Sequence, residues 1–459
     1  MEEEKKSFEI DMVRGPVLKK MLLFSLPLMC SSILQLLFNA ADIIVVGRFA
    51  GDNSLAAVGS NSALITLMTN LFIGFSVGAN VTAARFYGAR KQKDLKETVH
   101  TAMMLSVAGG LILTVIGQIG ARRILIWMEA PAEVLDLATL YLRVYFLGMT
   151  GMMIYNFGSA LLRAVGDTRR PLYFLAFSGV VNIGLNLFFV ISLKMDVAGV
   201  GAATAISQWL SAGLIVRCLL REKTGIHLVL RDLRIYKDKL IAIVRIGLPA
   251  GVQGMIFSLT NVLVQASVNS FGAVIVAGNS AAANIESFIY FAMNAFYQAT
   301  ISFTSQNVGA RRIKRVDKIL TRGELCVLAV GVTLGLLAVV FGPQLLGIYT
   351  TSEEVIDAGM HRLRIIALTY ALCGAMDVMV GSLRGMGCSL TPMLVSLIGV
   401  CGLRIIWITT IFQIPRFHTI NMLFYTYPIT WIITLSAHIV TFLIVRKRLR
   451  ERAVARLLD

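Results

Sequence analysis

Charged residues are scarce in this sequence. Asp, Glu, Lys and Arg make up only 15% of its 459 residues, whereas soluble domains carry about 25%. Hydrophobic residues make up 56%, and the mean hydropathy is +0.75. A soluble fold of this length has too little core to bury so much apolar surface. The sequence therefore predicts an all-α polytopic membrane protein, because long unbroken apolar runs are typical of spanning helices and not of the alternating strands of a membrane barrel.

Histidine and paired cysteine are also scarce. The five histidines are scattered, and no two cysteines form a CxxC pair. A metal centre, a bound cofactor or a disulfide is therefore not expected. No serine-nucleophile motif and no phosphate-binding loop is visible, so an enzyme is not expected either. The six cysteines are Cys30, Cys218, Cys326, Cys373, Cys388 and Cys401.

Apolar runs long enough to cross a bilayer recur along the chain, and twelve spans are predicted. Lys and Arg concentrate in the segments on one side of these spans, which predicts a multi-pass protein of the cell membrane with both termini in the cytoplasm. The net charge of +17 then reflects this topology and contact with anionic lipid, and nucleic acid is not an expected partner. The predicted spans are 18–46, 54–82, 98–121, 137–163, 171–192, 198–219, 241–268, 274–305, 323–347, 356–383, 391–412 and 420–445.

The two halves of the chain resemble each other at an offset of about 221 residues. Leu26-Pro27 recurs as Leu248-Pro249, and Gly88-Ala89-Arg90 recurs as Gly309-Ala310-Arg311. Two six-helix bundles related by a pseudo-two-fold axis are therefore predicted, with the substrate path between them. The predicted boundaries are 1–220 for the first bundle, 221–240 for a basic cytoplasmic linker and 241–459 for the second bundle.

Three acidic residues are assigned to the predicted spans: Asp42, Glu286 and Asp377. A charge at mid-membrane costs roughly 2.5–3.5 kcal/mol on insertion scales, so such a residue is usually protonated, paired or bound to an ion. Around Asp42 the sequence predicts a cation or proton site, because several amide and hydroxyl groups share its bundle. Its proposed neighbours are Asn39, Asn156, Asn182, Asn186 and Thr204. The alternative is that these polar groups only bridge helices.

A polar stripe runs along one predicted span of the second bundle. Glu286, Tyr290, Asn294 and Gln298 recur every four residues and share one helix face. Such a stripe must face protein or water, so it is assigned to a substrate cleft together with Asp377 and Asn261. Through the repeat, Asp377 aligns with Asn156, while Arg143 aligns with Arg364.

Five short motifs resemble the multidrug and toxic compound extrusion (MATE) transporters. They are the Leu26-Pro27…Asp42…Val46-Gly47 pattern, Phe86-Tyr87-Gly88-Ala89-Arg90, Leu162-Arg163-Ala164-Val165-Gly166-Asp167-Thr168…Pro171, Gln306-Asn307-Val308-Gly309-Ala310 and Leu383-Arg384-Gly385-Met386-Gly387. The resemblance covers nearly the whole chain. It implies a monomeric antiporter that exports amphipathic, often cationic organic compounds in exchange for H+ or Na+ by rocking of two bundles. A lipid-linked saccharide flippase of the same superfamily is the alternative.

The resemblance also implies roles for particular residues. Positions matching Asp42, Asn156, Asn182, Asn186 and Thr204 form the cation and proton site of the family, so Na+ at Asp42, Asn182, Asn186 and Thr204 is the one metal expected. The family often has Asp where this chain has Asn186. A single carboxylate attracts Na+ less strongly and leaves one titratable group, which favours protons slightly and leaves both ions open. Glu286 and Asp377 are expected to serve substrate recognition or a second protonation step.

Overall fold

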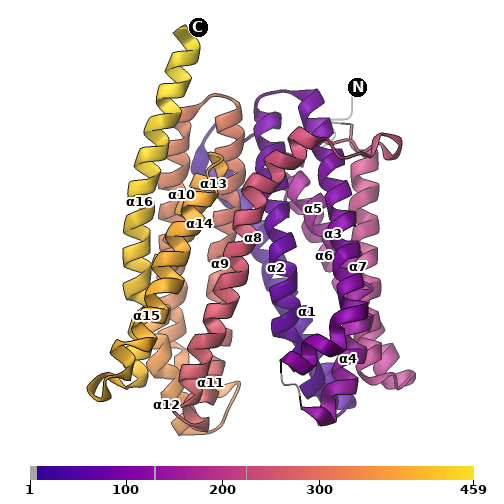
Figure 1. The fold of residues 1–459 in the computed structure, drawn as a ribbon, viewed down its shortest axis with the longest axis vertical. Coiled ribbons are helices and arrows are strands. Elements are labelled where there is room, and N and C mark those ends of the chain that lie inside the picture. Colours follow the sequence, from indigo (N-terminus) through magenta and orange to yellow (C-terminus); the bar gives the residue numbers. More distant parts are fainter. Residues whose placement is uncertain (1–7, 129–130, 224, 459) are drawn as a thin grey trace. The chain divides into compact units, whose positions relative to one another are not determined.

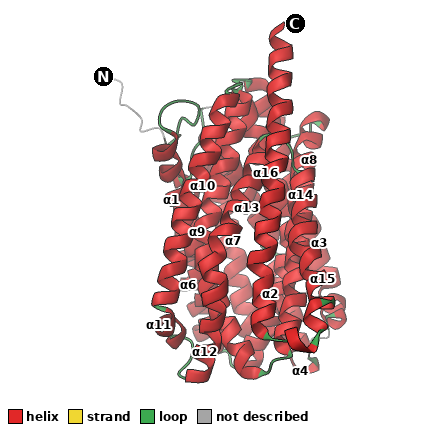
Figure 2. Ribbon diagram, turned by 90° about the vertical axis from the view of Figure 1, so that its left-hand side faces the viewer, coloured by secondary structure: helices red, strands yellow, loops and turns green. Residues whose placement is uncertain are grey.

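The structure is a computed structural model that describes residues 8–128, 131–223 and 225–458. The described residues form helices and loops and no strand (Figure 2), which confirms the predicted all-helical fold. The helices of the first half are α1 (Val17–Phe49), α2 (Asp52–Gly88), α3 (Gln92–Trp127), α4 (Ala132–Phe146), α5 (Met149–Ala164), α6 (Arg169–Leu187) with the π-helical η1 (Phe188–Ser192), and α7 (Asp196–Arg221). The helices of the second half are α8 (Lys237–Asn269), α9 (Ala273–Gly309), α10 (Ile313–Val340), α11 (Gly342–Gly347), α12 (Glu353–Arg362) with the π-helical η3 (Leu363–Ala367), α13 (Leu368–Gly385), α14 (Leu390–Ser396) with the π-helical η4 (Leu397–Gly402), α15 (Leu403–Thr409) and α16 (Ile420–Leu458).

The number of spanning helices differs slightly from the twelve predicted. Within the described residues, ten helices are long and apolar enough to cross a membrane, or eleven if α4 and α5, which meet at a bend of 45°, form one span. Helix α9 has 37 residues but is not among them. Its stripe of polar side chains lowers its mean hydropathy. Helix α9 is therefore long enough to cross a membrane but less apolar than the other spans.

The chain divides into two compact units, and two of the three boundaries lie inside helices. The first unit comprises Met1–Asp11 and Cys30–Gly251, and the second comprises Met12–Met29 and Val252–Asp459. The predicted boundaries at 220 and 241 therefore differ from the observed ones. Pro27 and Pro249 lie inside α1 and α8, and each helix changes unit within three residues of its proline. A proline lacks the N–H that would bond to a backbone carbonyl of the preceding turn. The two units therefore separate where each helix has lost a backbone hydrogen bond.

Each unit has its own apolar core, and Figure 1 shows the helices that form it. In the first unit, α3 packs on α5, and α5 packs on α2 and α7. In the second unit, α13 packs on α9, α10 and α16. Phe157 and Leu161 are buried in the first core, and Phe296 and Leu383 in the second.

Glycines let α2 and the first part of α8 touch within the first unit. A Cβ at Gly74 would lie 2.2 Å from the Gly251 nitrogen, and one at Gly78 would lie 2.2 Å from the Ile243 oxygen. Gly74 and Gly78 face Gly247 and Gly251, so a pair of small residues four apart lies on each helix. Such pairs allow the backbones of membrane helices to approach closely.

Replacing Gly78 by Leu is expected to separate α2 from α8 and to lower thermal stability. The new side chain meets backbone atoms, which cannot move aside as a flexible side chain can. The matched control is Gly59→Leu, also on α2, because a Cβ at Gly59 meets nothing within 4 Å. The midpoint of thermal unfolding in detergent checks this, and equal midpoints for the two variants would contradict the close packing.

One of the motifs that repeat between the halves, Gly88-Ala89-Arg90 with Gly309-Ala310-Arg311, lies at a helix C-terminal cap. After α2, the N–H of Lys91 donates to the Phe86 oxygen at 3.0 Å, and Arg90 has φ +57°. After α9, the N–H of Arg312 donates to the Asn307 oxygen at 2.8 Å, and Arg311 has φ +56°. A left-handed residue followed by this six-residue hydrogen bond is a Schellman cap. The repeated motifs therefore fix where α2 and α9 stop.

Candidate functional site

Asp42 lies in α1 and receives hydrogen bonds from two asparagines of α6. The side-chain amide of Asn182 donates to Asp42 Oδ1 at 2.9 Å, and the amide of Asn186 donates to the same oxygen. Asn182 and Asn186 are four residues apart and share a helix face. The helix can approach α1 because Gly179 leaves room for the Phe38 ring, 1.9 Å from where a Cβ would lie.

The amide oxygens of this cluster have no partner. Oδ1 of Asn182 and Oδ1 of Asn186 are buried and find no hydrogen-bond donor among the described residues. Buried polar atoms are normally paired. The hydroxyl of Thr204 lies near the Asp42 carboxylate, although its hydrogen bond goes to the Val200 oxygen at 3.0 Å. The neighbourhood of Asp42 is therefore rich in oxygen acceptors.

The other two expected neighbours do not bond to Asp42 in this structure. Asn156 donates to the Met152 oxygen of its own helix at 2.9 Å. Asn39 is exposed, and among the described residues no hydrogen bond joins it to Asp42. Of the six residues predicted for this site, the structure brings four together.

Glu286 has a partner that the sequence did not reveal. It lies on α9 and forms a two-pronged ion pair with Arg362, the last residue of α12, through Nε to Oε1 at 3.0 Å and Nη2 to Oε2 at 2.7 Å. The third donor, Nη1, reaches Asn279 Oδ1 at 2.6 Å. Glu286 and Arg362 are only 3% and 8% exposed. The carboxylate is thus neutralised within the second unit, unlike the unpaired carboxylate expected for a substrate site.

The remaining residues of the predicted substrate cleft separate into two groups. Tyr290 packs near the Tyr370 ring, with centroids 6.4 Å apart, and Asp377 is near enough to Tyr290 to act on it electrostatically. Asn294 and Gln298 are half-buried, whereas Asn261 is exposed. The structure therefore joins Tyr290 to Asp377 and leaves Asn261 apart from any described contact.

The predicted spans contain more charged residues than Asp42, Glu286 and Asp377, and some of their charged groups are buried. Glu324 also lies within the predicted span 323–347, and its Oε1 is buried without a partner among the described residues. Arg362, Arg384 and Arg404 are buried in the second unit. The sequence does mark these residues, because any ionisable residue inside a predicted span is a candidate functional group. The repeat pointed instead to Arg364, which is exposed.

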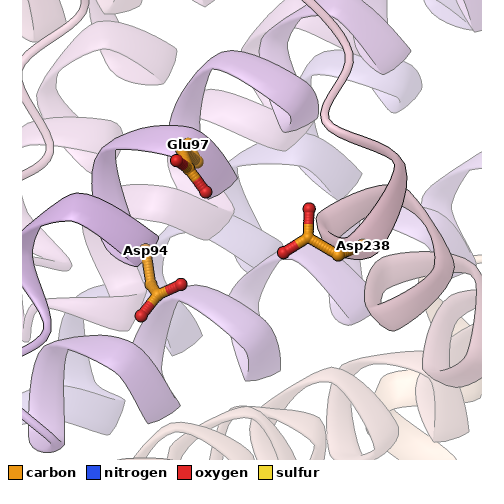
Figure 3. Close-up of side chains that lie close together, drawn as sticks. All are labelled: Asp94, Glu97 and Asp238. Atoms are coloured by element: carbon orange, nitrogen blue, oxygen red, sulfur yellow. The ribbon is translucent and has the colours of Figure 1, made fainter.

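A second group of carboxylates lies where α3 and α8 begin. Asp94, Glu97 and Asp238 point toward one another (Figure 3). The Lys239 ammonium lies between them, 2.5 Å from Asp94 and 2.6 Å from Asp238, so a lysine supplies the compensating charge. Nearby, Lys96 donates to Asp232 at 2.6 Å and holds the pKa of that carboxyl below its usual value.

Comparison with known proteins agrees with the repeat and the fold. The family model described as MatE matches residues 27–188 and 249–409, so it begins once at Pro27 and once at Pro249. The chain is 28% identical to "Probable multidrug resistance protein YoeA" of Bacillus subtilis, over 85% of this chain and 86% of that protein. It is 27% identical to "Probable multidrug resistance protein NorM" of Thermotoga maritima, over 84% of each.

Solved structures show the same fold. A transporter of the MOP superfamily from Pyrococcus furiosus, described as having a binding pocket of reverse polarity, superposes with a TM-score of 0.88 at 24% identity, over 97% of this chain and 99% of that one. An outward-facing multidrug resistance transporter of the MATE family superposes with a TM-score of 0.87 at 23% identity, over 98% of this chain and 99% of that one.

Proposed function

The chain belongs to the MatE family of multi-pass membrane transporters, and we propose that it is a multidrug exporter that moves amphipathic, often cationic organic compounds out of the cell in exchange for H+ or Na+. Members of this family are transporters and not enzymes. The relatives from Bacillus subtilis and Thermotoga maritima carry names that include multidrug resistance, which supports this substrate class. The proposed orientation has both termini in the cytoplasm, in keeping with the basic residues on that side.

The observation that carries the proposal is the carboxylate of Asp42 among amides. Two amide groups converge on one oxygen, Oδ1, and leave their own oxygens bare. The orientation of an amide is assigned from its hydrogen-bond network, and a half-turn exchanges its oxygen and nitrogen at little steric cost. Asn182 and Asn186 can therefore donate to an ionised carboxylate, or turn their oxygens to a bound cation or to a protonated carboxyl.

Exchange follows if the two ligands favour different arrangements of the protein. A ligand shifts a conformational equilibrium only by its differential affinity for the two states. We propose that the ion at Asp42 favours one state and the organic cargo the other, so that binding of each promotes release of the other. The cargo site is proposed in the second unit, around Tyr290, Asn294, Gln298 and Asp377.

Efflux of a cationic dye from proteoliposomes is expected to accelerate when a gradient of the coupling ion is imposed. The purified protein is reconstituted, the dye is loaded, and H+ and Na+ gradients are imposed separately, with vesicles lacking protein as the control. Acceleration by the H+ gradient alone assigns proton coupling, and acceleration by the Na+ gradient alone assigns sodium coupling. Dye flux that ignores both gradients would contradict an antiporter.

A further inference from the structure

The second unit contains three buried arginines among its described residues, and Arg404 is the one without an acceptor. Arg362 is fully paired by Glu286 and Asn279. Arg384 donates to the Tyr297 hydroxyl at 2.5 Å and to Gln253 Oε1 at 2.9 Å. Arg404 is 4% exposed, makes no hydrogen bond within the described chain, and has an Nε with no partner.

The Arg404 guanidinium lies over an aromatic face, and it acts electrostatically on the thiols of Cys373 and Cys401. Its Cζ lies 4.0 Å from the centroid of the Tyr427 ring on α16. A cation over an aromatic ring is stabilised, but a charge inside a membrane costs more than this stacking returns. The stacking covers the face of the guanidinium and leaves its N–H groups, which lie along the edge, without an acceptor. Two of these N–H groups fit the two oxygens of a carboxylate.

The surroundings of Arg404 suggest what the ligand is. The rings of Tyr427 and Tyr370 flank the Trp431 ring, with centroids 5.7 Å and 5.4 Å from it. Tyr370 and Tyr427 are half-buried, whereas Trp431 is buried, so the two tyrosines are the accessible members of this aromatic cluster. One guanidinium balances one negative charge. The fitting ligand is thus an aromatic compound with a single carboxylate.

A charge of opposite sign stands nearby. Asp377 lies one turn after Cys373 on α13, and both Asp377 and Arg404 act electrostatically on the Cys373 thiol. Among the described residues Asp377 accepts no hydrogen bond, and the cation that acts on it electrostatically is Arg384. An amine on the same ligand would find its counter-ion at Asp377.

The local fold supports a specialised role for this stretch. Arg404 follows the π-helical η4, and π-helical turns occur frequently at functional sites. By the repeat, Leu403 and Trp407 are the counterparts of Asn182 and Asn186. Spans that correspond in the two units therefore present amides to a carboxylate in the first unit and a bare guanidinium in the second.

We propose that Arg404 forms an anion subsite in the second unit, where it binds the carboxylate of an aromatic organic acid or zwitterion whose ring packs against the half-buried Tyr370 and Tyr427. This subsite rests on the proposed export function and defines part of its cargo. The cargo then includes carboxylates as well as the organic cations that the resemblance to the MATE transporters implies.

The test compares three fluorescent probes that share one ring system: 1-pyrenebutyrate, 1-pyrenebutanol and 1-pyrenebutylamine. Binding is measured by fluorescence to the purified full chain in nanodiscs of neutral lipid. Arg404→Gln is expected to weaken binding of the butyrate probe at least tenfold and to change binding of the alcohol and the amine less than twofold. Arg404→Lys is expected to retain part of the butyrate affinity. Arg364→Gln, which removes an exposed arginine of the same unit, is the matched control.

Two results would overturn the subsite. One is unchanged butyrate binding by Arg404→Gln, and the other is an equal loss for all three probes, which would make Arg404 a packing residue only. If Arg404→Gln does not fold, competition on the wild type decides, because benzoate must displace pyrenebutyrate while benzyl alcohol must not. Displacement by phosphate or by anionic lipid, without displacement by benzoate, would assign the arginine to a lipid headgroup and contradict the proposal. Gradient-driven efflux of the cationic dye from the same preparation tests the export function separately.

Discussion

Asp42→Asn is expected to remove most of the acceleration of efflux by an ion gradient while leaving binding of the cargo nearly unchanged. Asparagine keeps the shape of the side chain and can still bond to Asn182 and Asn186, but it neither ionises nor takes up a proton. Coupling between sites is typically worth 1–3 kcal/mol, which corresponds to about 5- to 150-fold. Gradient-driven efflux should fall by a factor in that range, as measured in proteoliposomes alongside the wild type.

A matched control shows whether the loss of efflux is specific to Asp42 or follows from removing a carboxylate anywhere in the first unit. Asp136 lies in the same unit, on α4, and pairs with Arg122 at 2.5 Å while its side chain is 83% exposed. Asp136→Asn removes an equal charge from an exposed pair, which contributes at most about 1 kcal/mol, and it should leave efflux unchanged. Full gradient-driven efflux by Asp42→Asn would remove the carboxylate from the mechanism.

The site in the first unit was predictable because its signals are local. A lone carboxylate in a span requires a partner, and Asn182 and Asn186 stand four residues apart on one helix. Sequence spacing does not determine which helices contact the face of α5 that carries Asn156, and in the structure Asn156 bonds within its own helix instead of to Asp42. The cap motifs were recognised as a family pattern, and the structure supplies their physical reason, which is the left-handed backbone at Arg90 and Arg311.

The second unit was harder to predict because its partners are distant in sequence. Glu286 and Arg362 are separated by 76 positions, and the repeat gives no clue, because the counterpart of Arg362 is Tyr141. Where the sequences of the two halves have diverged, the repeat does not predict which buried charges form ion pairs. Duplication therefore predicts helices and caps well, and it predicts the polar interior only where the same groups were kept.

Arg362→Met is expected to destabilise the second unit by about 3–5 kcal/mol, the usual cost of removing one partner from a buried ion pair. The Glu286 carboxylate would lose both prongs of its pair, and Asn279 Oδ1 would lose its donor. Glu286→Gln should cost less. The guanidinium would keep Asn279, and the rings of Phe424 and Tyr427 lie 5.7 Å from its Cζ. The midpoint of unfolding in detergent, by heat or denaturant, measures both losses.

The double variant decides whether the loss comes from an uncompensated charge or from poor packing. Glu286→Gln combined with Arg362→Met removes both charges, and a buried pair replaced by neutral groups of similar volume is often no less stable than the original. The double variant should therefore unfold at a higher midpoint than Arg362→Met alone. Arg364→Met, an exposed neighbour on η3, should behave as the wild type. If the destabilisations of the two single variants simply added in the double variant, the cause would be altered packing and not an uncompensated charge. Glu286 would then contribute only through its packing on α9.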